Sequence, residues 1–162
     1  MRLLGVMLAV ALLVPTLSVN PAKAHGPTRQ KVTETIVIDA PMSEVWAVVS
    51  NFQDMAWHPD ISKSEGSGGS AVGAKRVLTF KSGGTIAQEV TKLKDGKMLF
   101  YEVTKGDIKV VPVNNYSARI TVEDKDGKTL VTWRAAFYRG FMNNDPPPEL
   151  NDETAVKAVT AF

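Results

Sequence analysis

Residues 116–138, YSARITVEDKDGKTLVTWRAAFY, decide the fold, because they contain two alternating strands joined by a turn. Apolar side chains occupy every second position of both strands, which is the period of a β-strand. They are Tyr116, Ala118, Ile120 and Val122 in the first strand, and Val131, Trp133, Ala135 and Phe137 in the second. The opposite face is polar, and Asp126-Gly127 is typical of a hairpin turn. The pair predicts an antiparallel sheet covered on one face only.

Most of the chain before this pair repeats the strand pattern. Strands are predicted at residues 31–38, 61–65, 75–80, 85–93 and 98–105. A flexible loop is predicted at residues 66–69 and a hairpin turn at residues 82–84. Apolar residues recur at helical spacing after Pro41, which predicts a helix over residues 42–52 and a short turn of helix at residues 55–57.

A second amphipathic helix is predicted to start near Asn151 and to run to Phe162. The order of strand, helix, strands and helix indicates an α+β protein. A one-sided sheet of six to seven antiparallel strands must bury its apolar face, and the terminal helix is the long element available to cover it. We therefore expect a helix-grip fold, in which the sheet wraps around this helix and leaves an internal cavity. The helix is short and has no C-terminal cap, so we expect it to be truncated at Phe162.

The first 24 residues have the pattern of a secretory signal peptide. Arg2 precedes an apolar run of about a dozen residues, and Ala22 and Ala24 mark a small-residue cleavage site. The run is too short to span a bilayer. We therefore expect cleavage after Ala24, which leaves a polar lead at residues 25–30 and one domain at residues 31–162.

The net charge and the absence of cysteine exclude several classes of function. The whole chain has 19 Lys and Arg against 17 Asp and Glu, and the signal carries Arg2 and Lys23, so the mature chain has no net charge. A neutral chain offers no electrostatic footprint for nucleic acid or for an anionic membrane. The absence of cysteine excludes disulfides, thiolate nucleophiles and Cys-ligated zinc. We expect a periplasmic protein with neither nucleic acid nor membrane as a partner.

Several short motifs, taken in order, resemble the START-like (SRPBCC) superfamily, in particular its polyketide cyclase/dehydrase-type branch. They are Asp39-Ala40-Pro41, Val45-Trp46, Trp57-His58-Pro59, residues 112–116, and Val131-Thr132-Trp133 with Phe137. The resemblance extends from about Val32 to the end of the chain, and it implies the helix-grip fold. Because this fold hosts carriers, cyclases and regulators alike, the resemblance alone implies no particular reaction.

The segment NNDPPPEL at residues 143–150, together with the signal peptide, is similar to MxaD-type periplasmic proteins of methylotrophic bacteria. That similarity implies a non-catalytic accessory role in methanol oxidation, assisting the encounter between methanol dehydrogenase and its cytochrome c acceptor. Prolines pre-order a surface and lower the entropic cost of binding. The candidate partner contacts are Asn144, Asp145, Pro146, Pro147 and Pro148.

The alternative function is that of a carrier or sensor, which binds an apolar small molecule in the internal cavity. Aromatic side chains would line such a cavity, and tyrosine hydroxyls and a histidine would orient the ligand. The candidate residues are Trp57, His58, Phe80, Tyr101, Tyr116, Trp133 and Phe137. The competing interpretation of this set is ordinary core packing.

No catalytic constellation is recognised, so we expect neither an enzyme nor a cofactor. None of the serines stands in a G-x-S-x-G motif. A cyclase or dehydratase that uses His58 with Glu102 or Tyr101 is the remaining enzymatic hypothesis, while the simpler role for His58 is to fix a turn. His25 and His58 would be the ligands of a copper site, but nothing in the pattern brings them together, and we expect no metal.

Overall fold

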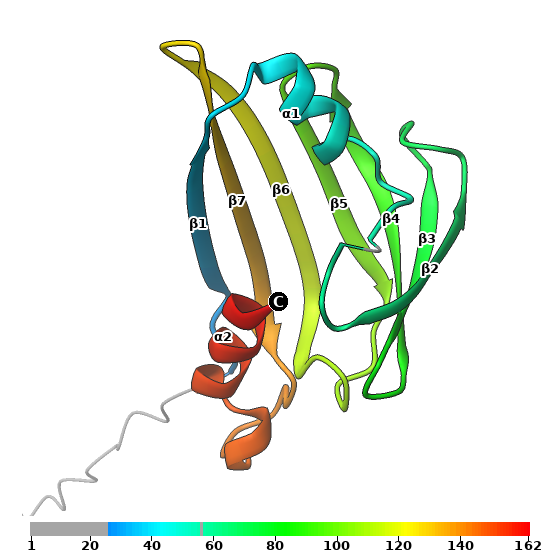
Figure 1. The fold of residues 1–162 in the computed structure, drawn as a ribbon. Helices are drawn as coiled ribbons and strands as arrows, with labels where there is room; N and C mark the ends of the chain where they lie inside the picture. The colour runs from blue at the N-terminus through cyan, green and yellow to red at the C-terminus, as the bar shows by residue number, and fades with distance from the viewer. Residues whose placement is uncertain (1–25, 56) are drawn as a thin grey trace, which may run out of the picture.

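In the computed structural model, which describes residues 26–55 and 57–162, seven strands form one antiparallel sheet (Figure 1). The strands are β1 (Gln30–Ile38), β2 (Ile61–Ser67), β3 (Lys75–Phe80), β4 (Thr85–Lys94), β5 (Met98–Lys105), β6 (Val113–Lys125) and β7 (Lys128–Arg139). The helices are α1 (Met42–Val49), α2 (Asp152–Ala161) and the 3-10 turn η1 (Pro148–Leu150). The predicted α+β helix-grip fold, a six- to seven-stranded antiparallel sheet with a C-terminal helix, is confirmed.

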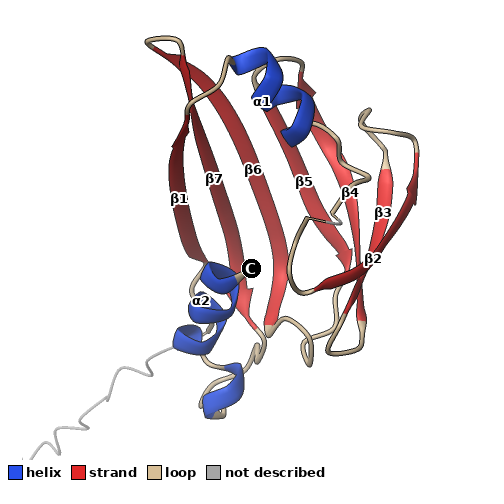
Figure 2. Cartoon of the chain, in the orientation of Figure 1, coloured by secondary structure: helices blue, strands red, loops and turns tan. Residues whose placement is uncertain are grey.

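The order of strands across the sheet is β1-β7-β6-β5-β4-β3-β2. Strands β1 and β2 follow one another in the chain but form opposite edges of the sheet. Residues 39–60, which include α1, therefore cross the sheet from one edge to the other (Figure 1). They cross on the same face as α2, which we call the inner face (Figure 2).

Both helices are held on the inner face by their apolar residues. Helix α1 buries Val45 and Trp46 against β6 and β7, and the Trp46 Nε1–H donates to Asp95 Oδ1 at 2.9 Å. Helix α2 buries Ala155 and Val159 against β1 and β7. No helix within the described ranges is both long and apolar enough to cross a membrane.

The start of α2 is fixed by the cap that the sequence predicts. The Asn151 Oδ1 accepts from the Thr154 backbone N–H at 2.8 Å, which satisfies one of the free donors of the first turn. The buried Arg139 at the end of β7 makes an ion pair with Asp152 at 2.8 Å. The side chain of Gln30 on β1 also donates to Asp152, at 3.2 Å, so the first turn of α2 is attached to both strands beneath it.

Helix α1 is shorter than predicted. The sequence predicts a helix over residues 42–52, whereas α1 ends at Val49. Beyond Ser50 the chain turns so that Phe52 enters the core, where it is 1% exposed and its ring centroid lies 5.9 Å from that of Tyr101. Of the short turn of helix predicted at residues 55–57, Ala56 lies outside the described residues, and neither Met55 nor Trp57 belongs to a helix. The His58 N–H donates to the Met55 carbonyl oxygen at 3.0 Å.

The loop predicted at residues 66–69 begins later than expected, because Gly66 and Ser67 belong to β2. Gly66 is the register partner of Arg76 on β3. A Cβ atom at position 66 would lie 2.0 Å from Gln53 Oε1 and 2.1 Å from the Lys75 carbonyl oxygen. Glycine is required here because the neighbouring backbone leaves no room for a side chain.

We predict that Gly66→Ala destabilises the protein by about 1–3 kcal/mol, because the new methyl group can only be accommodated by moving backbone. Chemical denaturation measures this free energy of unfolding. Gly26→Ala is the matched control, since a Cβ at Gly26 meets nothing within 4 Å. Equal stability of the two variants would contradict the close approach at Gly66.

Candidate functional site

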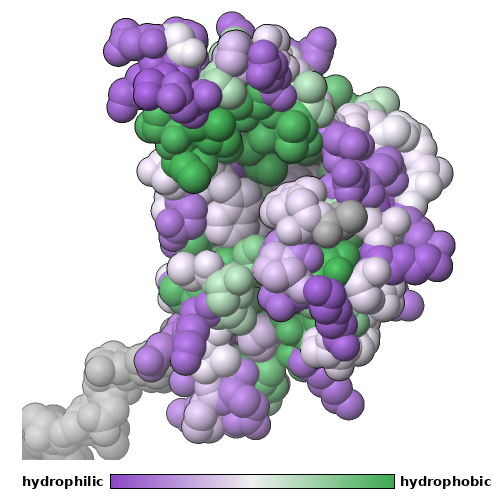
Figure 3. All heavy atoms as spheres, in the orientation of Figure 1, coloured by the Kyte–Doolittle hydropathy of each residue, from purple (hydrophilic) through white to green (hydrophobic). Residues whose placement is uncertain are grey.

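An apolar groove lies on the inner face, between α1 and the end of α2, with a cavity volume of about 540 Å³. Residues of β1, β5, β6 and β7 form its floor, and α1 and the segment that follows it, including Phe52, Met55 and Trp57, form its sides. Its aliphatic and tryptophan lining includes Ile36, Ile38, Val48, Val49, Ile120, Val131, Trp57 and Trp133. Figure 3 shows hydrophobic surface gathered below α1 on this face.

The rim of the apolar groove exposes large apolar side chains to solvent. Ile36 is 61% exposed, Val48 is 68% exposed and Trp57 is 67% exposed. They come from β1, α1 and the segment that follows α1, and the groove brings them together. A clustered exposed apolar surface of this kind marks a binding site more often than a scattered one does.

His58 is a buried residue in the wall of the groove, 5% exposed. Its Nδ1 accepts from the Asp60 backbone N–H at 3.2 Å, so its Nε2 carries the proton and donates to the main-chain oxygen of Phe162 at 2.7 Å. The rings of His58 and Phe162 also lie 4.7 Å apart. With both nitrogens engaged, His58 joins the turn after α1 to the end of α2.

Arg76 is a buried cation in the same wall, and sequence reasoning missed it. Its guanidinium lies 4.1 Å from the Phe52 ring centroid and 5.5 Å from that of Tyr101. Its Nε donates to Gln88 Oε1 at 2.7 Å, and its Nη1 donates to the Phe52 carbonyl oxygen. Burial lowers the pKa of Arg76, and Tyr101 and Tyr116 oppose that shift. An arginine nevertheless remains charged at physiological pH.

A signal for this residue was present in the strand alternation. Arg76 shares a face of β3 with Leu78 and Phe80, both of which are buried. Gln88 likewise shares a face of β4 with Ile86 and Val90. A polar residue at a position where the alternation of a strand calls for an apolar one indicates a buried polar group. Arg76 on β3 and Gln88 on β4 are two such residues, and they lie opposite each other.

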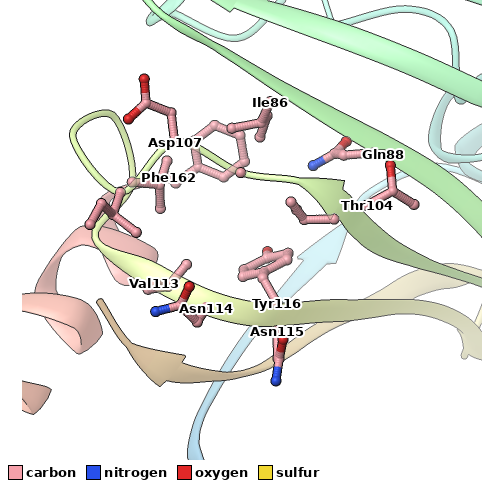
Figure 4. A pocket seen from close by; sticks show the side chains of 13 residues that line it. Ile86, Gln88, Thr104, Asp107, Val113, Asn114, Asn115, Tyr116 and Phe162 are labelled. Carbon is pink, nitrogen blue, oxygen red and sulfur yellow. The ribbon is translucent and has the colours of Figure 1, made fainter. Parts of the chain in front are cut away.

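A smaller pocket of about 180 Å³ lies next to Arg76's partner Gln88 (Figure 4). Gln88 and Tyr116 come from different strands, and both line this pocket. The Gln88 Nε2 and the Tyr116 Oη are buried without a hydrogen-bond partner. Burial raises the pKa of Tyr116 well above its ordinary value, so this hydroxyl stays protonated. We call Arg76, Gln88, Tyr101 and Tyr116 the buried polar cluster.

The structure divides the predicted ligand residues into three groups. Trp57, His58, Tyr101 and Trp133 line the apolar groove. Tyr116 lines the smaller pocket. Phe80 and Phe137 line neither of these two pockets. Phe80 packs in a cluster near Phe162, and Phe137 is fully buried with its ring stacked on Tyr116.

The enzymatic hypothesis pairs His58 with Glu102, and the copper hypothesis pairs it with His25. Glu102 is exposed and follows the buried Tyr101 along β5, so the two side chains project from opposite faces of the sheet. A pair of Glu102 with His58 is therefore not formed. His25 lies outside the described residues. Within the described ranges, no group of acidic or histidine side chains is arranged to hold a metal ion.

The predicted partner segment lies at the surface between β7 and α2. Asn144, Asp145 and Pro148 are exposed, and Pro146 and Pro147 are partly buried. The segment is anchored by the Arg139 Nη2, which donates to the Asn143 carbonyl oxygen at 2.9 Å, and by η1, which leads into α2.

Known proteins share the sequence pattern and the fold of this chain. The sequence profile of the family described as "polyketide cyclase / dehydrase and lipid transport" matches residues 29–162. No curated protein sequence matches the chain. The structure of the protein XoxI from Bacillus cereus is 24% identical, with a TM-score of 0.64, over 80% of this chain and 84% of that one.

Norcoclaurine synthase from Thalictrum flavum has the same fold at lower identity. A truncated form is 13% identical, with a TM-score of 0.61, over 84% of this chain and 92% of that one. The complex of this synthase with dopamine and hydroxybenzaldehyde is also 13% identical, with a TM-score of 0.59, over 83% of this chain and 81% of that one. Because the family profile spans most of the sequence and the fold agrees, the chain belongs to the polyketide cyclase/dehydrase and lipid transport family.

Proposed function

We propose that this protein binds an apolar small molecule in the groove between α1 and α2, as a carrier or sensor and not as an enzyme. The observation that carries the proposal is the groove itself, about 540 Å³ in volume. Its aliphatic and aromatic lining comes from α1, from strands β1, β5, β6 and β7, and from the segments that follow the two helices. Sites for small molecules have this size and this largely apolar lining. Membership of a family described by lipid transport as well as by cyclase and dehydrase chemistry is consistent with it.

A binding role accounts for more of the site than a catalytic one does. The histidine in the groove wall uses both ring nitrogens for main-chain contacts, so proton transfer by His58 would require one of those contacts to break. Tyr101 is buried in the same wall, where its ring lies 5.5 Å from the Arg76 guanidinium. The apolar walls, in contrast, need only a ligand of matching surface to exclude water.

A second proposed function, an accessory role in methanol oxidation, is favoured by the segment at residues 144–148. Its exposed residues are held by a buried arginine on one side and by a capped helix on the other. Such a pre-ordered surface loses little conformational entropy when a partner binds. In this proposal the protein is exported to the periplasm, and the segment contacts methanol dehydrogenase or its cytochrome c.

The first prediction concerns the groove. N-phenylnaphthylamine, a neutral apolar probe whose fluorescence rises in apolar surroundings, is expected to bind, and Val48→Phe is expected to weaken this binding about tenfold, or about 1.4 kcal/mol. Val48 is 68% exposed and lines the groove, so the larger ring fills the site without displacing the core.

Val72→Phe provides the matched control, because Val72 is 61% exposed and lies outside the groove. Its dissociation constant for the probe should equal that of the unmodified protein. No fluorescence rise with the unmodified protein, or an equal loss in both variants, would refute binding in the groove.

The second prediction concerns the partner segment. Replacing Pro146-Pro147-Pro148 with Gly-Ser-Gly is expected to weaken binding to methanol dehydrogenase about tenfold, because a flexible segment must be ordered on binding. Surface plasmon resonance measures the affinity, and circular dichroism checks that α2 stays folded. An unchanged affinity would remove this segment from the interface.

The third prediction concerns export. Expressed with its full sequence in a Gram-negative host, the protein is expected in the periplasmic fraction with a mass that corresponds to residues 25–162, because the first 24 residues have a signal pattern. Mass spectrometry of that fraction gives the result directly. An intact chain in the cytoplasmic fraction would count against export.

A further inference from the structure

Arg76 and Arg139 are the two buried arginines among the described residues, and their charges have different surroundings. Arg139 is 7% exposed and makes an ion pair with Asp152 at 2.8 Å. Arg76 is 5% exposed, yet no acidic side chain of the described residues forms an ion pair with it. The fold thus buries one cation without an ion pair, and this cation lines the apolar groove, whose lining also includes Glu34 and Asp54.

Keeping a cation away from water without an anion is unfavourable. The Phe52 and Tyr101 rings offset part of this cost through cation–π contacts. Gln88 and the Phe52 carbonyl accept two of the five guanidinium N–H groups. Among the described residues, the hydrogen bonds found for this guanidinium come from Nε and Nη1.

The polar side chains next to Arg76 also have groups without a hydrogen-bond partner. Because the Arg76 Nε–H can only donate, it fixes the Gln88 amide with its oxygen toward Arg76 and its NH₂ group elsewhere. That Nε2 has no partner, and neither has the Tyr116 Oη. Gln88 is 1% exposed and Tyr116 is 5% exposed, so water does not reach them freely. The buried polar cluster therefore holds one charged group and, in the Gln88 Nε2, one amide donor without a hydrogen-bond partner.

We propose that the ligand of the apolar groove is an apolar carboxylic acid, whose carboxylate pairs with Arg76 while its hydrocarbon part lies against the groove walls. A carboxylate consists of acceptors only, carries the missing negative charge, and matches the guanidinium fork in geometry. Arg76 is only 5% exposed, so folding has already removed most of its hydration and binding the acid incurs less of the desolvation cost. This inference rests on the proposed function, since it names the class of ligand for the same groove.

The test compares two probes that differ only in the head group, dodecanoate and dodecanol, each measured at neutral pH by displacement of N-phenylnaphthylamine. The unmodified protein is expected to bind dodecanoate at least about tenfold more tightly than dodecanol, as a charge-assisted hydrogen bond allows. A groove without a cation would favour the alcohol, because the carboxylate is the better hydrated of the two.

Two variants assign the preference to Arg76. Arg76→Met removes the charge and keeps an apolar side chain of similar length. The ratio of its dissociation constants for dodecanol and dodecanoate should no longer favour the acid. Gln88→Glu keeps the acceptor for Arg76 but supplies a carboxylate from the protein itself, so it should lose the same preference. If Arg76→Met fails to fold, Gln88→Glu alone decides.

The outcomes separate this inference from the proposed function. Binding of neither probe refutes the groove as a binding site. Equal binding of both probes by the unmodified protein, or an acid preference that survives in a folded variant, leaves the groove but overturns the assignment of an acidic ligand to Arg76.

Discussion

A buried guanidinium on β3, the strand next to the sheet edge, is the constraint that several features of this structure serve. The Phe52 ring can contact Arg76 because α1 ends at Val49 and Phe52 turns inward, while the Tyr101 ring reaches it from β5. The strand that carries Arg76 is approached closely by β2, and Gly66 allows that approach. The end of a helix, a glycine in a strand and a glutamine in the core thus serve one electrostatic requirement.

The inner face of the sheet is covered unevenly, and this distinguishes the site from the core. Near β6 and β7, α1 covers the sheet with Val45 and Trp46, and α2 covers the opposite end with Ala155 and Val159. Between the helices, the aliphatic side chains of β1 and β7 remain open to the groove. Apolar residues that would form core under a continuous helix form a binding surface here.

Strand alternation predicted the fold well, because one face of the sheet is buried and the other is not. The limits of β3 and β5, the faces of β6 and β7, and the Asn151 cap all follow from local rules. The site was predicted only in part. Residue type selected the aromatic set, but it could not separate Trp133, which lines the groove, from Phe137, which is fully buried. Both residues are on β7, so the difference depends on what covers each part of that strand.

The polar part of the site was missed for a different reason. Arg76 and Gln88 stand in apolar registers, and the alternation rule treats such residues as interruptions. Their meaning emerges only when register places them next to each other across β3 and β4. Gly66 was similarly interpreted as part of a flexible loop, because the close approach of residues 53 and 75 depends on contacts between separate segments.

The pairing of β1 with β7 also sets the order in which the chain can fold. Gln30 lies opposite Phe137 and Val32 lies opposite Ala135, so the first strand meets its only strand partner more than a hundred residues later. The hairpins from β2 to β7 can form as each strand becomes available, whereas β1 has to wait for the last. Contacts this distant in sequence slow folding, because a long loop must close first. The floor of the groove, which β1 shares with β7, is therefore among the last parts of the molecule to be assembled.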